Sequence, residues 1–302
     1  MTSLFIGLIP TVIVLVILGG AFTVLKLNEL RKKGKRSPLT AQLLRSPGES
    51  LRGQIEDLSL DITFYTMIAP LVPLSLYAAY FSQIYLGGAK VTPLVALFYF
   101  ALSIGTVFYC LAKLWVLFKK RTALRLGFDC EVAVGQELNQ LMLEGCSVFH
   151  DFPADKFNID HVVVSQKGIF AVETKGRAKP DKKGGTAEAT VIYDGQSLNF
   201  PNGKETGYLA QAARQAKWLS QWLSSAVGEA VTARPVLVLP GWFIDRKKPS
   251  DMLIFNGKNP ELLLKWSNNA ALPETLVKRI AHQLEQRCRD IEPSAYSKVQ
   301  GK

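Results

Sequence analysis

Residues 158–175 read NIDHVVVSQKGIFAVETK, and this stretch decides the fold of the second half of the chain. It holds two short runs rich in Val, Ile and Phe, at 159–165 and 169–174, separated by polar residues that end in Gly168. Runs of this composition on either side of a tight turn predict two antiparallel β-strands. The turn length therefore determines which residues of the two strands face each other.

Three ionisable residues are brought together by this hairpin. Glu173 and Lys175 are two positions apart, so they project from the same face of their strand. The antiparallel turn places Asp160 opposite one of them, within one position of the register. Two carboxylates can hold Mg²⁺ or Mn²⁺, which polarises a phosphodiester and lowers the pKa of a bound water. Lys175 would position or deprotonate that water, and Glu131 on a preceding helix could reach the same ion.

An ordinary surface cluster of charged strand-end residues is the alternative interpretation. The apolar runs beside the trio favour the functional one, because burying unpaired charged groups is costly.

Three long uncharged runs, at 4–25, 62–86 and 91–112, dominate the first part of the chain. A helix needs roughly 20 residues to cross about 30 Å of hydrocarbon. We therefore expect an α-helical membrane region of three transmembrane helices over residues 1–121, followed by a domain over 122–302. Residues 1–3 carry no basic side chain and no A-x-A pattern follows the first run, so we expect a retained anchor instead of a cleaved signal peptide.

Basic residues are distributed unevenly among the connections. The loop at 26–61 is rich in Lys and Arg, whereas the second connection has only Lys90. Positively charged loops stay in the cytoplasm, so this loop and the 122–302 domain are predicted to be cytoplasmic and the N-terminus outside. The expected location is the inner (plasma) membrane of a bacterium. The basic run at 31–36 would contact anionic lipid headgroups. The spans contain no acidic residue or Arg, which disfavours a channel or transporter.

The net charge of +11 fits anionic lipid, nucleic acid or both, and does not distinguish them. The four cysteines form no CxxC pair, which predicts free thiols in a reducing compartment. Further patterns predict a mixed α/β domain. Its remaining elements are helices at 131–144, 205–227 and 273–291, strands at 147–152, 236–239 and 253–255, and a hairpin turning at Asp194 and Gly195.

The segments FDCEVAVGQELNQL (128–141) and IDHVVVSQKGIFAVETKG (159–176) resemble the NERD (nuclease-related) domain family. The resemblance covers roughly residues 126–223, and differs where Cys130 replaces the Gly usual before the helix acid. It implies a restriction-endonuclease-like fold of the PD-(D/E)xK superfamily and a Mg²⁺-dependent or Mn²⁺-dependent phosphodiesterase acting on DNA or RNA. The residues implied are the helix acid Glu131, the metal ligands Asp160 and Glu173 with Glu131 as a further ligand, the catalytic Lys175, and Gln211 supporting the active-site face.

Basic residues around this region suit a nucleic-acid backbone. They are Arg177, Lys179, Lys182, Lys183 and Arg214, with further charge at Lys204, Arg246, Lys247 and Lys248. A solvated loop near an anionic membrane is the alternative interpretation. The second candidate function is accordingly a non-catalytic membrane protein whose nuclease-like domain binds nucleic acid or a protein partner. The sequence leaves the oligomeric state open.

Overall fold

The computed structural model describes residues 13, 16–17, 19–20, 23–24, 26–27, 38–86, 92–180, 189–266 and 271–293. Two compact units are formed by these parts of the chain. One contains Ile55–Thr122, and the other combines Ala41–Gln54 with Ala123–Glu292. We call Ala41–Gln54 the strap. The strap includes the first residues of a long apolar helix, yet it belongs to the same unit as the mixed α/β region.

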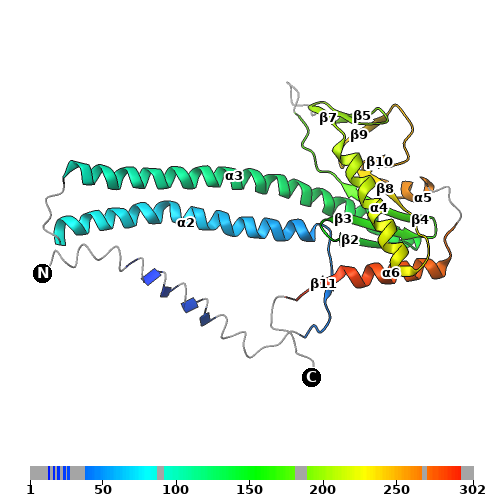
Figure 1. Ribbon diagram of the computed structural model, residues 1–302, viewed down its shortest axis with the longest axis horizontal. Coiled ribbons are helices and arrows are strands. Elements are labelled where there is room, and N and C mark those ends of the chain that lie inside the picture. The colour runs from blue at the N-terminus through cyan, green and yellow to red at the C-terminus, as the bar shows by residue number, and fades with distance from the viewer. Residues whose placement is uncertain are drawn as a thin grey trace. The chain divides into compact units, whose positions relative to one another are not determined.

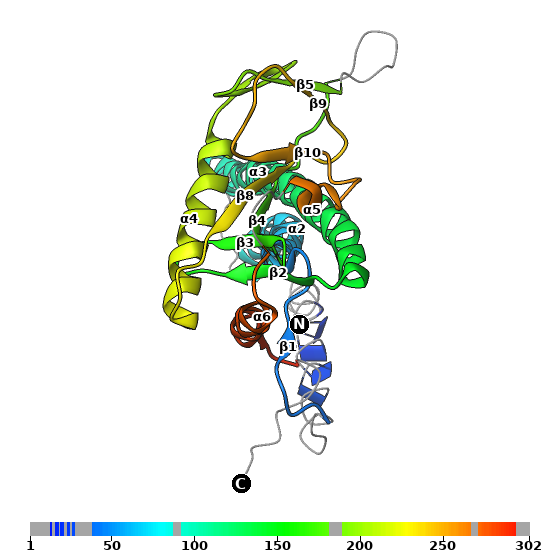
Figure 2. The same ribbon diagram turned by 90° about the vertical axis from the view of Figure 1, so that its right-hand side faces the viewer.

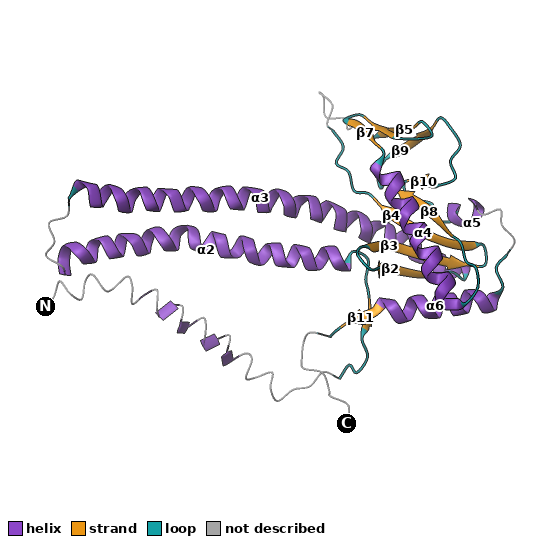
Figure 3. Ribbon diagram, in the orientation of Figure 1, coloured by secondary structure: helices purple, strands orange, loops and turns teal. Residues whose placement is uncertain are grey.

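The first unit is built from the greater part of two long helices, α2 (Glu49–Leu86) and α3 (Pro93–Asn139) (Figures 1 and 3). They pack antiparallel: the Tyr80 and Tyr99 rings lie 5.7 Å apart, and those of Tyr65 and Tyr109 lie 6.2 Å apart. Both are long and apolar enough to cross a membrane, and only 6% of each apolar window is buried. The structure thus supports two of the three predicted spans.

Two parts of the membrane prediction cannot be compared with the structure. Most of the first predicted span, at 4–25, lies outside the described residues, and so does the connection that contains Lys90.

The helix predicted at 131–144 is not a separate element. α3 continues unbroken to Asn139, and a 3₁₀ helix, η1 (Gln140–Glu144), follows and ends at Gly145 with φ 78°. Residues 113–126 contain neither Gly nor Pro and are mostly good helix formers. Helix propagation therefore continues through them once the apolar run has nucleated it.

A five-stranded sheet in the order β10-β8-β4-β3-β2 forms the centre of the second unit. β2, β3 and β4 pair antiparallel, whereas β4, β8 and β10 pair in parallel. Every residue of β4 is buried, which explains its continuous apolar sequence. The strands are β2 (Ser147–Pro153), β3 (Asn158–Ser165), β4 (Gly168–Thr174), β8 (Ala233–Val238) and β10 (Leu253–Phe255).

Helices cover both faces of this sheet. α4 (Gly207–Val227) and α6 (Glu274–Cys288) pack on one face through residues such as Leu219 and Ile280. The last turns of α3, η1 and α5 (Leu262–Trp266) pack on the other. Figure 2 shows α4 and α5 on opposite sides of the sheet. The mixed α/β class predicted for this region is confirmed.

A smaller sheet has the order β7-β6-β5-β9. The predicted hairpin at Asp194 and Gly195 joins β5 to β6, and Asp194 Oδ1 accepts the Gln196 and Ser197 backbone N–H groups at 2.9 and 2.8 Å. β7 and β9 were not predicted, because their short sequences GKE and FIDR lack an apolar alternation. The strands are β5 (Thr190–Tyr193), β6 (Leu198–Phe200), β7 (Gly203–Glu205) and β9 (Phe243–Arg246).

The end of the domain also differs from the prediction. The helix expected over 273–291 stops at Cys288, and Arg289–Ile291 form a strand, β11. β11 pairs antiparallel with β1 (Leu43–Leu44) of the strap. These long-range backbone hydrogen bonds replace those that another turn of helix would have made. The four cysteines are free thiols, as predicted.

The contact between the strap and α3 can be tested with two matched glycine variants. A methyl group at Gly135 would lie 2.6 Å from Pro47 Cγ, whereas one at Gly53 would meet nothing within 4 Å. We expect Gly135→Ala to destabilise the domain by about 1–3 kcal/mol through overpacking. Gly53→Ala should stabilise it by up to about 1 kcal/mol through helix propensity. Thermal unfolding of the full chain measures both, and equal shifts would contradict the described contact.

Candidate functional site

The β3–β4 register brings the predicted acids to the end of their strands. His161 pairs with Val172, so Asp160 and Glu173 occupy the next two facing positions. The Thr174 backbone N–H donates to Asp160 Oδ2 at 2.6 Å, which fixes that carboxylate beside β4. The hairpin thus places the two acids as the sequence predicts.

Glu173 is the most constrained member of the cluster. Its side chain is 2% exposed, and its Oε1 atom lies 2.5 Å from Lys175 Nζ. The same oxygen accepts a 2.6 Å hydrogen bond from Gln211 Nε2 on α4. Its second oxygen, Oε2, is buried and has no hydrogen-bond partner in the described part of the chain. A buried acceptor without a donor is costly, so the geometry fits an additional ligand at Oε2.

The surrounding charges shift the proton affinities of the cluster. Burial, followed by the negative charges of Glu173 and Glu131, raises the pKa of Asp160 well above its ordinary value. Burial, followed by the charge of Asp151, raises the pKa of Glu131 from 4.5 to about 8. Burial acts against the charged form of Lys175, but the charge and hydrogen bond of Glu173 outweigh it and raise the pKa of the ammonium. Lys175 is therefore a cation at neutral pH.

A further acid, Asp151, lies beside Asp160 on the neighbouring strand β2. His150 pairs with His161 and Phe152 with Ile159, so Asp151 of β2 faces the Asp160 position of β3. Asp151 is 3% exposed and adopts φ 46°, a conformation that non-glycine residues rarely take. We did not predict it as a site residue, although a carboxylate between His150 and Phe152 of a mostly buried strand was a usable signal.

A polar cleft of about 500 Å³ opens beside these acids. Glu131, Asp151 and Asp160 line it together with the loop at 154–158 and three strap residues, Ser50, Leu51 and Gln54. Glu173 is buried and does not line it. Asp160 therefore connects the buried acid to the cleft that a substrate could enter.

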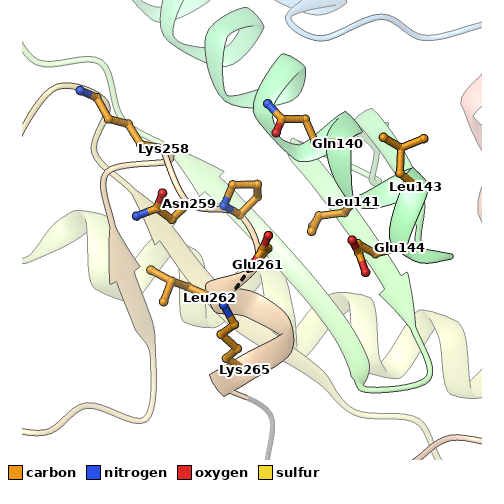
Figure 4. Close-up of a pocket in the computed structure, with 10 residues that line it drawn as sticks. Gln140, Leu141, Leu143, Glu144, Lys258, Asn259, Glu261, Leu262 and Lys265 are labelled. Carbon is orange, nitrogen blue, oxygen red and sulfur yellow. Dashed lines mark hydrogen bonds and ion pairs between the residues drawn. The ribbon is translucent and has the colours of Figure 1, made fainter.

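A second cavity, of about 440 Å³, lies between η1 and α5 and contains none of the predicted site residues (Figure 4). Two of its charged groups pair with each other: Lys265 Nζ lies 2.8 Å from Glu261 Oε2, one helical turn away. Its two acids, Glu144 and Glu261, come from separate segments, η1 and the residue before α5. We therefore place the candidate site at the first cleft.

The metal-ligating potential of the site rests on two acids. Across the ranges that the structure describes, no three His, Cys, Asp or Glu side chains form a ready-made metal cluster. Asp160 and Glu173 provide carboxylate oxygens, and Mg²⁺ commonly keeps several waters beside one or two such ligands. The residues present therefore fit a hydrated divalent ion held by two carboxylates, with Glu131 outside that pair.

The predicted nucleic-acid contacts are only partly described. Lys182 and Lys183 lie outside the described residues. Arg177 is half-buried, with its guanidinium 4.3 Å from the centre of the Phe200 ring and hydrogen-bonded to Asn202. Lys179 and Arg214 are exposed, and Arg214 follows Gln211 on α4.

The two buried histidines serve the packing between β2, β3 and α3. Their Nδ1 atoms are 2.9 Å apart, and His150 Nε2 lies 3.0 Å from Asn139 Oδ1. Burial lowers the pKa of both, that of His150 to about 4, so both rings are neutral at physiological pH.

Residues 126–240 match the family model of NERD, the nuclease-related domain. The matched segment runs from the end of α3 through β8 and contains Glu131, Asp160, Glu173, Lys175 and Gln211. The resemblance drawn from the sequence is therefore supported across this segment. No curated protein and no solved structure matches the chain.

The raised pKa of Glu131 predicts how stability depends on pH. A carboxyl group whose pKa rises on folding stabilises the fold below its ordinary pKa, and this contribution is lost as pH rises through the folded value. The metal-free protein should therefore lose stability between about pH 4.5 and 8. We expect Glu131→Gln to reduce this loss, measured as the fall in melting temperature from pH 5 to pH 8.5. Glu137→Gln, on the same helix, controls for removal of one charge. An unchanged slope in Glu131→Gln would contradict the assignment.

Proposed function

We propose that this protein is a membrane-anchored nuclease of the PD-(D/E)xK type, which uses Mg²⁺ or Mn²⁺ to hydrolyse phosphodiester bonds of DNA or RNA at the cytoplasmic face. One observation carries the proposal. Lys175 and Gln211 hold one oxygen of the buried Glu173, and its other oxygen has no hydrogen-bond partner among the residues that the structure describes. A divalent cation bound there would satisfy that oxygen and compensate both negative charges. The match to the nuclease-related domain supports the same reaction class.

Each residue of the cluster has a role in this proposal. Asp160 and Glu173 would hold the ion, with Glu131 contacting it through water or directly. When bound, the ion supplies an activated water and polarises the scissile phosphate. Gln211 holds Glu173 in position by its 2.6 Å hydrogen bond.

The protonation states refine the role of Lys175. Because Glu173 raises its pKa, Lys175 remains an ammonium and is suited to stabilise the negative charge of the transition state, not to remove a proton. Glu131 lines the cleft together with Asp160 and is therefore the better candidate for a proton acceptor.

The membrane anchor is supported by exposed apolar surface on α2 and α3. Leu94, Phe108 and Trp115 of α3 are 75–77% exposed. Monomeric soluble proteins rarely leave such contiguous apolar surface in water. We propose that both helices span the bilayer, that residues 4–25 add a third span, and that residues 1–121, apart from the strap, form the membrane region. The basic run at 31–36 would then contact anionic headgroups on the cytoplasmic side, the same side as the nuclease domain.

Activity should depend on the cluster and on a divalent ion. The full chain in lipid nanodiscs, with labelled single- and double-stranded DNA and RNA, should cut at least one substrate in Mg²⁺ or Mn²⁺ and none in EDTA. Lys175→Met and Asp160→Asn should each reduce the rate by roughly 100-fold or more. Lys265→Met removes an exposed lysine of a surface ion pair and should leave the rate unchanged. Binding without cutting in every condition would instead support a non-catalytic module.

Metal binding can also be measured without any substrate. Because the ion would bind only the folded site, an excess of 100 times its dissociation constant should stabilise the domain by about 2.7 kcal/mol. We expect Mn²⁺ to raise the melting temperature of the wild type and EDTA to reverse the rise. Asp160→Asn should abolish the effect, whereas Asp155→Asn, in the loop that lines the cleft, should retain it. An equal rise in Asp160→Asn would place the ion elsewhere.

A further inference from the structure

The strap is joined to the nuclease-related domain at three places along its length. At its start, β1 pairs with β11, with Leu43 opposite Ile291. The Arg45 backbone N–H extends this pairing by donating to Cys288 O at 3.1 Å. Because these contacts link residues from opposite ends of the chain, the strap is held by the domain and not only by its own helix α2.

The next part of the strap packs against α3 through two close contacts. Pro47 lies against Gly135, where no side chain would fit without displacement. At Gly48, which has φ 72°, a methyl group would lie 2.8 Å from Phe128 Cδ2 and 3.7 Å from Glu131 Oε2. The strap therefore passes directly beside the helix acid, and its turn requires glycine both for conformation and for space.

Arg45 connects this segment to both sides of the domain. Its Nη1 atom donates to Asp151 Oδ2 at 2.7 Å. Its Nε and Nη2 atoms donate to the two carboxylate oxygens of Asp290, each at 2.8 Å. The Arg45 side chain is 17% exposed and that of Asp151 4%, so water screens the Arg45–Asp151 pair little. A guanidinium is suited to bridging two carboxylates in this way because its donors form a rigid fork.

Asp151 in turn positions the start of α2. Its Oδ2 atom accepts hydrogen bonds from the Ser50 backbone N–H at 3.0 Å and from the Ser50 hydroxyl at 2.6 Å. Asn158 of β3 donates to Asp151 Oδ1 at 3.0 Å. The unusual backbone conformation of Asp151 is thus stabilised by groups from the strap and from β3.

The cleft beside Asp160 has the strap as part of its lining. Ser50, Leu51 and Gln54 line it, and Gln54 is exposed. A polynucleotide extends well beyond its scissile phosphate, so a strand bound at Asp160 and Glu131 would run along the neighbouring walls.

We propose that the strap is a wall of the nucleic-acid cleft, in which Gln54 contacts the bound strand and Arg45 is the positioning residue that holds the wall in place. The inference rests on the proposed nuclease function and extends its binding surface to a segment outside the nuclease-related match. It also means that a fragment beginning at residue 122 would lack part of the site.

The contact of Gln54 with nucleic acid can be tested by its charge. The probe is a labelled single-stranded DNA, and its RNA counterpart, bound to the full chain in nanodiscs with Lys175→Met present to prevent cleavage. Gln54→Glu should weaken binding by about tenfold and Gln54→Lys should strengthen it by a similar factor, because phosphate contacts respond to local charge. Gln286→Glu and Gln286→Lys make the same changes at an exposed position of α6 and should leave affinity nearly unchanged.

The role of Arg45 is tested by separating binding from turnover. With Lys175 intact, Arg45→Met should raise KM about tenfold or more while kcat stays within about twofold, because uniform binding contacts are lost. Arg45→Lys keeps the charge and should recover part of the affinity. Arg279→Met removes another arginine that pairs with a carboxylate, Glu229, and serves as the matched control. If Arg45→Met fails to fold, the binding measurements on Gln54→Glu and Gln54→Lys test the strap inference on their own.

The outcomes separate the two proposals. A wild-type chain that neither binds nor cuts nucleic acid overturns the nuclease function, and the strap inference with it. A wild type that cuts while both Gln54 variants bind as tightly as it does overturns the strap inference alone. Equal effects at Gln54 and Gln286 would do the same, because the response would then reflect overall charge.

Discussion

The pairing register between β3 and β4 is the constraint on which the rest of the site depends. It is fixed by apolar residues on both strands that are buried on both faces of the sheet, so a slip of one position would move every side chain to the wrong face. The same register puts Asp160 beside Glu173 and leaves the Thr174 N–H pointing at Asp160. The hydrophobic core thus determines the geometry of the acids, and the acids have no freedom to move apart and relieve their repulsion.

The protein itself compensates part of the negative charge of this cluster. Lys175 and Gln211 satisfy one oxygen of Glu173, and Arg45 with Ser50 satisfies Asp151. Glu131 is left with a pKa of about 8, and Glu173 Oε2 has no hydrogen-bond partner within the described ranges. These uncompensated carboxylate groups lie where the proposed cation would bind. A domain that served only as a scaffold would gain stability by replacing these acids with apolar residues.

The sequence predicted most of what arises from local pattern, and missed what arises from distant contacts. The hairpin of β3 and β4, the convergence of Asp160, Glu173 and Lys175, and the long helix that carries Gln211 follow from periodicity and turn residues. The strap was not predicted, because β1 has only two residues and its partner β11 lies about 245 positions away, where no periodic signal connects them. Asp151 was not predicted as a site residue either. Its contacts come from Arg45 and Ser50, which the sequence analysis had assigned to a basic loop.

The proposed mechanism requires one divalent ion that bridges Asp160 and Glu173. A crystal structure of the full chain grown with Mn²⁺, and recorded at a wavelength where manganese scatters anomalously, tests this requirement. We expect one strong anomalous peak at roughly 2.0–2.3 Å from an oxygen of each carboxylate, with Glu173 Oε2 as one of the two. A peak at another site, or none while Glu173 Oε2 accepts a hydrogen bond from a protein group, would contradict it.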